Sequence, residues 1–357
     1  MAQSVSYRER VLRSIRHQPL DAVPWQMDLT RGVEKGLKQH YQSDDLIEAT
    51  GDHIAWIKPK LPPAMVEPAL EAGLVKGEFG DIWRMRDEMG NWGELVHCPI
   101  PEPTLKNYQF PDPALPGRFA HIPELRARYA DRFFMVSLGG LFERAWSLCG
   151  GFERYLFYLA TEIPFVEELT EKLADYTCAL VPQLVGMGVD GVRFGDDWGF
   201  QHHLMIRAEV WRKLYKPHYR RILDTIHAHG FITAMHSCGN LTQLLPDLIE
   251  IGLEIYHPLQ PEAMDVPAVK RDYGRHITLW GGLGTQTTLP LGTPADVRRE
   301  VRERIDLFLA DGGYILAPAG AISPETPVEN VVTFIETARS QLIEREEMPN
   351  LRKIAWA

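Results

Sequence analysis

The chain has 357 residues and a formal net charge of −10, and its 45% hydrophobic and 24% charged residues can form a large core. The negative charge argues against nucleic-acid binding, which needs basic patches, and the sequence has neither a signal peptide nor the roughly 18 consecutive apolar residues of a membrane span. Its four cysteines lack the spacing of a disulfide framework, so we expect a protein of the reducing cytoplasm.

The first third of the chain is expected to be mostly irregular. Residues 6–17 have apolar residues at helical spacing and predict a short amphipathic helix. Residues 25–116 are rich in proline, and the runs 79–85 and 93–98 predict the two arms of a β-hairpin. We therefore predict an N-terminal extension with a hairpin over residues 1–116.

From about residue 117, short apolar runs alternate with helical segments. The runs begin at Phe133, Val189, Phe231, Leu253, Ile277 and Tyr314. Short strands separated by helices imply βα units and a parallel sheet. We predict an α/β fold, a (β/α)8 TIM barrel, as a single domain over residues 1–357 with its main repeats in 117–345. A doubly wound open sheet is the competing arrangement, but the glycine-rich dinucleotide fingerprint that would favour it is missing.

A histidine and a cysteine follow one of these predicted strands. His236 and Cys238 come directly after the run 231–235, and residues two apart in an extended chain point the same way. Zinc takes imidazole nitrogen and thiolate ligands, and the chemistry of such barrels lies where the strands end. We therefore predict metal or catalytic use of the pair, the alternative being a buried thiol packed beside an imidazole.

Other predicted strand ends also carry polar residues. Asp196 and Asp197 follow the run from Val189, and two adjacent carboxylates repel each other unless a partner compensates them. Either could instead cap a helix, because an aspartate accepts hydrogen bonds from free N–H groups there. His257 follows the run from Leu253 and could simply terminate a strand before Pro258.

A set of segments spread over nearly the whole chain matches one known superfamily. The segments are residues 7–12, 78–83, 141–146, 196–201, 236–240, 259–261, 280–282, 285–286 and 326–330. Together they resemble the uroporphyrinogen decarboxylase superfamily and, within it, the branch of cobamide-dependent methyltransferases of the methylcobamide:thiol type. The resemblance implies a (β/α)8 barrel with its pocket at the carboxyl ends of the strands, and it matches His236 and Cys238 to the zinc-binding pair of the methyltransferase branch.

The sequence departs from the decarboxylases in a segment that binds substrate. These enzymes hold the carboxylates of their substrate with arginines soon after the first Pro-Trp stretch. Here Asp28 stands about where such an arginine is expected, and only Arg31 could help. A carboxylate has the wrong charge for this task, which argues against porphyrinogen decarboxylation.

A second departure concerns the metal. In the metal-binding relatives a third ligand, usually cysteine, lies six residues before the closing Thr-Pro, and that position is Gly320 here. We therefore expect Glu143 or His257 to complete the site, with Asp196 and water as further candidates.

The resemblance implies a zinc-dependent methyltransferase that moves a methyl group between a corrinoid on a partner protein and a thiol or pterin acceptor. Asp196 or Asp197 would act as a base or orienting group, and Gln286 and Tyr314 would line the pocket. Neither nucleic acid nor a membrane is expected as a partner, and a homodimer is a further option. Three alternatives stay open: a uroporphyrinogen-type decarboxylase, a zinc-dependent lyase or hydrolase, and a non-catalytic relative that binds corrinoid or thiol, which the glycine at position 320 would favour.

Overall fold

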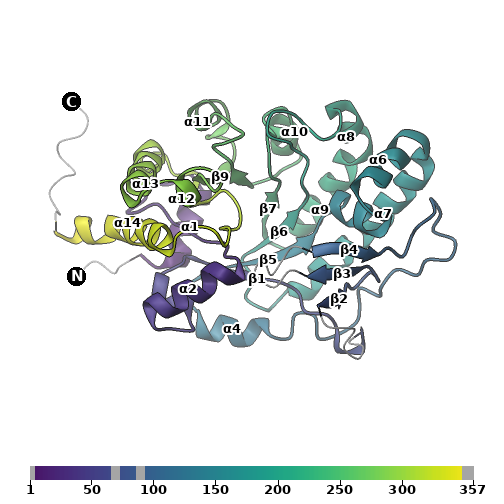
Figure 1. The fold of residues 1–357 in the computed structure, drawn as a ribbon, viewed down its shortest axis with the longest axis horizontal. Helices are drawn as coiled ribbons and strands as arrows, with labels where there is room; N and C mark the ends of the chain where they lie inside the picture. Colours follow the sequence, from purple (N-terminus) through teal and green to yellow (C-terminus); the bar gives the residue numbers. More distant parts are fainter. Residues whose placement is uncertain (1–4, 66–72, 86–92, 348–357) are drawn as a thin grey trace. The chain divides into compact units, whose positions relative to one another are not determined.

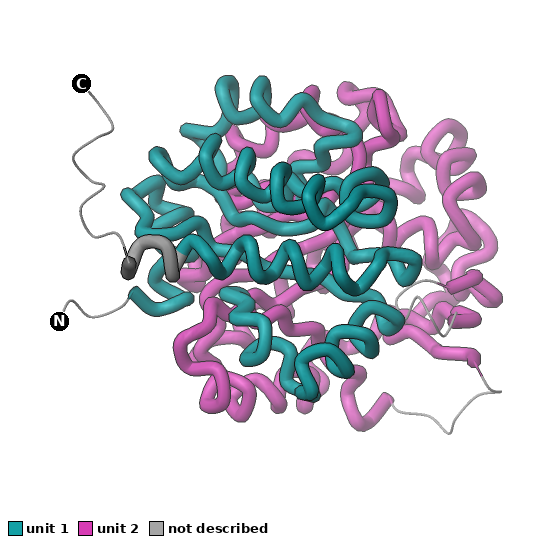
Figure 2. The backbone as a smooth tube through the Cα atoms, turned by 60° about the vertical axis from the view of Figure 1, so that its left-hand side comes forward, with its two compact units in different colours: residues 1–54, 258–357 teal, residues 55–257 magenta. Residues whose placement is uncertain are grey.

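The computed structural model describes residues 5–65, 73–85 and 93–347. Their contacts divide the chain into two compact units (Figure 2). Unit 1 consists of Met1–Ile54 and Pro258–Ala357, and unit 2 of Ala55–His257. Each unit is built from parallel strands and the helices that connect them.

Unit 2 contains a parallel sheet with the strand order β1-β5-β6-β7-β8 (Figure 1). The strands are β1 (Ile54–Ile57), β5 (Phe133–Gly139), β6 (Gly191–Gly195), β7 (Ile232–His236) and β8 (Ile255–Leu259). The register pairs Gly139 with Gly195, Gly195 with His236, and His236 with His257. Because neighbouring strands lie about 4.8 Å apart, these four residues follow one another across the sheet and lie close in space.

Helices connect the strands of unit 2. They are α4 (Ile122–Arg128), α5 (Phe142–Leu148), α6 (Phe152–Thr161), α7 (Ile163–Leu180), α8 (Ala208–Leu214), α9 (Lys216–Ala228), α10 (Leu245–Glu250) and two 3-10 helices, η1 (Pro63–Met65) and η2 (Val181–Leu184). The longest of these helices, α7, ends at Leu180, and the chain continues directly as η2. The sequence pattern did not predict α5 and α6, which bring residues 142–161 onto the carboxyl end of β5.

The predicted hairpin is present in unit 2 and has a third strand. Its arms are β3 (Ile82–Met85) and β4 (Gly93–His97), which pair antiparallel, and β2 (Leu74–Lys76) pairs with β3 on the other side. The extension before it is less irregular than predicted, since residues 31–57 form α2 (Arg31–Tyr41), α3 (Leu46–Thr50) and β1. Helix α3 and strand β1 are short, with five and four residues, and the 11-residue α2 buries Val33 and Leu37.

Unit 1 joins the two ends of the chain. Its elements are α1 (Tyr7–Ile15), α2 (Arg31–Tyr41), α3 (Leu46–Thr50), β9 (Thr278–Leu283), β10 (Tyr314–Pro318), α11 (Val266–Tyr273), α12 (Thr288–Leu291), α13 (Pro294–Phe308) and α14 (Val328–Glu347). Strands β9 and β10 pair in parallel, and Trp25 and Leu29 add parallel bridges to Leu316 and Ile322. Within the described residues, no helix has the length and apolar character that a membrane crossing requires.

Candidate metal centre

The carboxyl end of β7 positions His236 and Cys238, and the structure brings their side chains together. The Nε2 atom of His236 lies 3.5 Å from the Sγ atom of Cys238. Strand β7 ends at His236, and Cys238 follows two residues later, the spacing at which side chains of an extended chain lie on the same side. Both side chains are partly accessible rather than sealed in the core.

Asp197, two residues after β6, completes a group of three possible ligands. Its Oδ1 atom lies 3.4 Å from Nε2 of His236 and accepts a hydrogen bond of 2.8 Å from the backbone N–H of Cys238. One donor atom from each of the three residues lies within 4.8 Å of the others. The ligand set therefore combines a carboxylate, an imidazole and a thiol.

Two glycines allow the loops after β6 and β7 to approach closely enough for this contact. A Cβ atom at Gly199 would lie 2.7 Å from the backbone nitrogen of Asn240, and one at Gly239 would lie 2.2 Å from the carbonyl oxygen of Gly199. Neither distance is compatible with a side chain. The Oγ atom of Ser237 also accepts a hydrogen bond of 2.9 Å from the backbone N–H of Trp198, which ties the two loops together.

The distances from His236 to the two other donor atoms fit tetrahedral zinc. With Zn–S near 2.3 Å and Zn–N or Zn–O near 2.0–2.1 Å, a tetrahedral angle places sulfur and nitrogen about 3.5 Å apart, and nitrogen and oxygen about 3.4 Å apart. The observed separations are 3.5 Å for Cys238 and His236, and 3.4 Å for His236 and Asp197. Three protein ligands leave the fourth position open, as in catalytic rather than structural zinc sites.

His257, predicted as a metal ligand, lies behind His236 instead. The two Nδ1 atoms are 2.8 Å apart, so His257 contacts the ring edge of His236 that faces away from Cys238. Burial holds the pKa of His257 well below its ordinary value, helped by His236 and Arg193, and the ring is therefore neutral. A neutral His257 can accept the Nδ1 proton of His236, which leaves the Nε2 lone pair directed at Asp197 and Cys238.

The charges around Cys238 favour a cation at this point. Burial, with Asp197 and Glu143 adding to it, raises the pKa of the Cys238 thiol well above its ordinary value. Without a cation the thiol is protonated, because a thiolate would lie in a buried place beside carboxylates. A divalent ion would instead favour the deprotonated thiolate, since its positive charge stabilises the thiolate and the carboxylates together.

Asp196 occupies a different position from its neighbour Asp197. Its carboxylate accepts hydrogen bonds of 2.6, 2.8 and 2.6 Å from the backbone N–H groups of Leu141, Phe142 and Glu143, at the start of α5, and another from the hydroxyl of Tyr219. Burial nevertheless raises its pKa to about 6. Asp196 therefore anchors the first turn of α5 to β6 and is fully buried.

Glu143, the other residue predicted as a ligand, stands near the group without belonging to it. Burial raises the pKa of its carboxyl well above the ordinary value, and Asp197 and Asp196 raise it further. The three-ligand group among the described residues consists of Asp197, His236 and Cys238 only. Among the described residues the geometry therefore favours Asp197, beside His236 and Cys238, as the third candidate ligand, and the ligand roles of Glu143 and His257 stay predictions.

The two pocket residues predicted from the later part of the chain lie in unit 1. Gln286 is exposed, and its backbone N–H donates to Glu262. Tyr314 is fully buried, stacks on Phe308 and donates its hydroxyl proton to the carbonyl of Gly281. These are the contacts of a core residue, so Tyr314 stabilises unit 1 rather than lining an open pocket.

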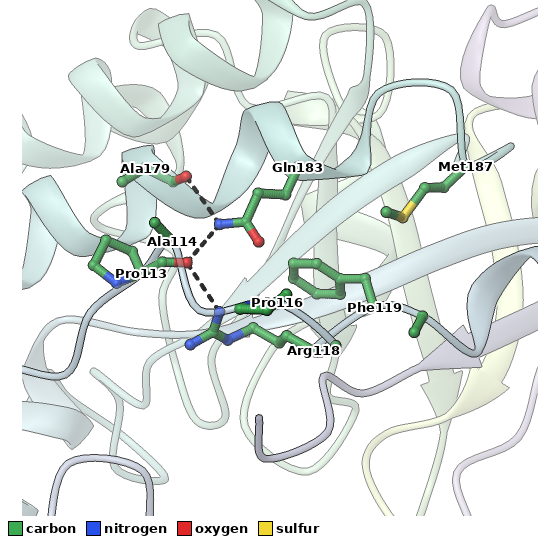
Figure 3. Close-up of a pocket in the computed structure, with 10 residues that line it drawn as sticks. Pro113, Ala114, Pro116, Arg118, Phe119, Ala179, Gln183 and Met187 are labelled. Carbon is green, nitrogen blue, oxygen red and sulfur yellow. Dashed lines mark hydrogen bonds between the residues drawn. The ribbon is translucent and has the colours of Figure 1, made fainter. Parts of the chain in front are cut away.

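A cavity of about 560 Å³ lies elsewhere in unit 2 (Figure 3). Figure 3 shows that Gln183 and Arg118 both turn their donor groups toward the carbonyl of Pro113, at 2.6 and 3.0 Å. None of the three residues of the candidate ligand group lines this cavity.

Comparison with known proteins gives a consistent result. The family model described as uroporphyrinogen decarboxylase (URO-D) matches residues 100–341, more than half of the chain. A curated protein of Methanosarcina mazei, "Methylcobamide:CoM methyltransferase MtbA", is 24% identical over 354 residues, covering 93% of this chain and 97% of its own length. A "Uroporphyrinogen decarboxylase" of Methylococcus capsulatus is also 24% identical, over 284 residues that cover 72% of this chain and 77% of that protein.

A solved structure, a methyltransferase from Methanosarcina mazei, superposes on this chain with a TM-score of 0.74. It covers 94% of this chain and 99% of its own, at 18% identity. The likeness confirms the predicted α/β barrel fold, and the family match confirms the resemblance found in the sequence. The chain is an enzyme that belongs to the uroporphyrinogen decarboxylase (URO-D) family.

Proposed function

We propose that this enzyme is a zinc-dependent methyltransferase that moves a methyl group between a corrinoid on a partner protein and a thiol or pterin acceptor. The observation that carries the proposal is the spacing of 3.5 and 3.4 Å among Cys238, His236 and Asp197, which matches tetrahedral zinc. The likeness to methylcobamide:CoM methyltransferases over nearly the whole chain supports the reaction class.

Each residue of the centre has a distinct task in this proposal. Asp197, His236 and Cys238 hold the ion, and His257 keeps the proton of His236 on Nδ1 so that Nε2 can bind. Asp196 fixes the start of α5, and with it Glu143, beside the ligands. When bound, zinc supplies the charge that lowers the pKa of an acceptor thiol, so that the thiolate exists at neutral pH.

The transfer itself is a displacement at carbon. The acceptor sulfur, as a thiolate, attacks the methyl carbon held on the corrinoid of the partner protein. A carbon–sulfur bond would form as the bond between the methyl carbon and the corrinoid breaks, the electron pair of that bond would leave with the corrinoid, and the thiol proton would already have left to solvent. The corrinoid contributes the leaving group, and this chain orients the sulfur and excludes other nucleophiles.

Elemental analysis of the purified enzyme tests the metal centre directly. We expect about one zinc per chain in the wild type and a nearly complete loss in Cys238→Ala and Asp197→Ala. Cys178→Ala is the matched control, because this cysteine lies on α7 and contacts Thr225, away from the ligand group. A Cys238→Ala protein that keeps a full zinc complement, or a wild type that binds none after reconstitution, contradicts the proposal.

An activity assay tests the reaction class. Zinc-loaded enzyme should demethylate methylcobalamin in the presence of a thiol. The change in the cobalamin absorption spectrum measures this reaction, and Cys238→Ala should not catalyse it.

Decarboxylation of a porphyrinogen is the second candidate, favoured by the match to a uroporphyrinogen decarboxylase. Incubation with uroporphyrinogen separates the two: release of CO2 by wild type and Cys238→Ala alike would favour the decarboxylase. We expect no CO2 release, because Asp28 stands where a carboxylate-binding arginine would be needed.

A further inference from the structure

An arginine lies on the same face of the sheet of unit 2 as the histidine of the metal centre. Arg193 lies in the middle of β6, and its strand partners are Ser137 of β5 and Ala234 of β7. A Cβ atom at Gly195 would lie 3.7 Å from the Cβ atom of His236, so side chains at these two positions share a face. Because side chains two residues apart on a strand point the same way, Arg193 extends from that face too.

The head group of Arg193 is held in a defined place inside the protein. The residue is only 7% exposed. Its Nη1 atom donates a hydrogen bond of 3.0 Å to Oγ of Ser137, and its Cζ atom lies 4.0 Å from the ring centroid of Trp56. The face of a tryptophan ring attracts a guanidinium. Both of these contacts are with uncharged groups, so they orient the guanidinium without neutralising its charge.

The same tryptophan connects Arg193 to the metal centre. The ring of Trp56 meets the ring of His257 edge-on, with the centroids 5.9 Å apart, and His257 contacts His236 through their Nδ1 atoms. The charge of Arg193 also acts on the thiol of the centre. Burial and the nearby carboxylates raise the pKa of Cys238, and Arg193 opposes them. A fixed positive charge therefore lies beside the ligand group.

The charge balance of the centre shows what this cation can do. The carboxylate of Asp197 and the thiolate of Cys238 together match the charge of a zinc ion, and His236 is a neutral ligand. A thiolate acceptor at the open fourth position brings one further negative charge into a partly buried place, which is unfavourable unless a cation lies near. An acceptor that binds through an uncharged nitrogen brings no such charge.

We propose that Arg193 is the residue that makes the metal centre select an anionic acceptor, a thiolate, over an uncharged one. The inference rests on the proposed function and favours the thiol among the acceptors left open there. Arg193 supplies the balancing positive charge when a thiolate binds, and by the same Coulomb interaction it repels the metal ion. It therefore acts with opposite signs on the affinity for zinc and on the affinity for the acceptor.

The size of both effects follows from Coulomb's law. With an effective dielectric constant of about 20, a unit charge roughly 10 Å away shifts the binding constant of another unit charge about tenfold. Removing the charge of Arg193 should therefore weaken the binding of a thiolate by about this factor. Zinc adds two positive charges and displaces one thiol proton, so its affinity should rise and not fall. Damage to the fold would instead weaken both.

The variant Arg193→Gln tests the two signs in one protein. Competition with a chromophoric chelator measures zinc affinity, and calorimetry measures the binding of mercaptoethanol and of imidazole to the zinc-loaded enzyme. We expect Arg193→Gln to bind mercaptoethanol about tenfold more weakly, imidazole within about twofold of wild type, and zinc at least as tightly. Arg193→Lys keeps the charge and should retain most of the mercaptoethanol affinity. The control Arg154→Gln makes the same change in net charge at an exposed residue of α6 and should behave like wild type.

The outcomes separate this role of Arg193 from the proposed function. Unchanged mercaptoethanol affinity in Arg193→Gln, or equal weakening of mercaptoethanol, imidazole and zinc, overturns the role while the metal centre stands. The expected pattern in an enzyme that fails to demethylate methylcobalamin supports the role and refutes the proposed function. A wild type that binds no zinc overturns both. Arg193→Met, whose side chain can pack on Trp56 without a charge, replaces Arg193→Gln if circular dichroism shows that Arg193→Gln does not fold.

Discussion

Replacing His257 with phenylalanine should weaken zinc binding without removing a ligand. In the structure the Nδ1 atoms of His257 and His236 are 2.8 Å apart, and His257 is neutral and buried. It can therefore accept the Nδ1 proton of His236, which is the arrangement that frees Nε2 for the metal. Phenylalanine keeps a ring of similar size but accepts no hydrogen bond, so the zinc-binding form of His236 loses its partner.

The cost follows from that single hydrogen bond. An unsatisfied buried donor costs about 1–3 kcal/mol, and each 1.4 kcal/mol is tenfold in an equilibrium constant, so zinc affinity should fall by about 5- to 150-fold. This range agrees with the roughly 10- to 100-fold effects seen when an outer-shell partner of a metal-bound histidine is removed. Competition with a chromophoric zinc chelator measures the affinity.

His257→Gln is the matched control, because its amide oxygen can accept the same proton, and it should bind zinc more tightly than His257→Phe. Circular dichroism of both variants checks that the fold is kept. A folded His257→Phe protein with wild-type zinc affinity would refute the assigned role of His257 and the proton position on His236.

Two further predictions concern stability. Asp196→Asn should lower the free energy of unfolding, measured by urea titration, by about 2–4 kcal/mol, because the new amide N–H2 group would face N–H and O–H groups that now donate to the carboxylate. Tyr219→Phe removes only one of these donors and should lower it by about 1 kcal/mol. An Asp196→Asn protein as stable as the wild type would contradict this role of Asp196. Burial would raise the pKa of Asp247, but hydrogen bonds from Lys216 and Arg212 hold it below its ordinary value of 3.8. The ionised Asp247 carboxylate therefore stabilises the fold at pH values above 3.8, and this stabilisation is lost as the pH falls through the lower pKa of Asp247 in the folded protein. The gap in Tm between wild type and Asp247→Asn should stay constant from about pH 7 to pH 5 and close near pH 3, whereas a gap independent of pH would refute the ion-pair role.

Local patterns in the sequence were sufficient to predict the alternation of strands and helices. Apolar runs such as 133–139 match β5 (Phe133–Gly139) in full, because a strand buried on both faces has a continuous apolar sequence. In residues 31–57, α3 (Leu46–Thr50) and β1 (Ile54–Ile57) were missed because each is short, and short elements gain their stability from packing rather than from their own periodicity. The 11-residue α2 (Arg31–Tyr41) was missed although its buried Val33 and Leu37 are four residues apart, as on one face of a helix. The family resemblance rested on motifs, and the comparisons confirm it.

The sequence by itself also determined that His236 and Cys238 lie together, since the period of an extended chain is two residues. It could not decide which of two adjacent carboxylates joins them. Only the tertiary structure decided this, because the N–H groups at the start of α5 take up Asp196, which leaves Asp197 to face His236. The place of His257 was likewise set by strand register, a long-range property: its pairing with His236 puts it against the ring edge of His236 that faces away from Cys238.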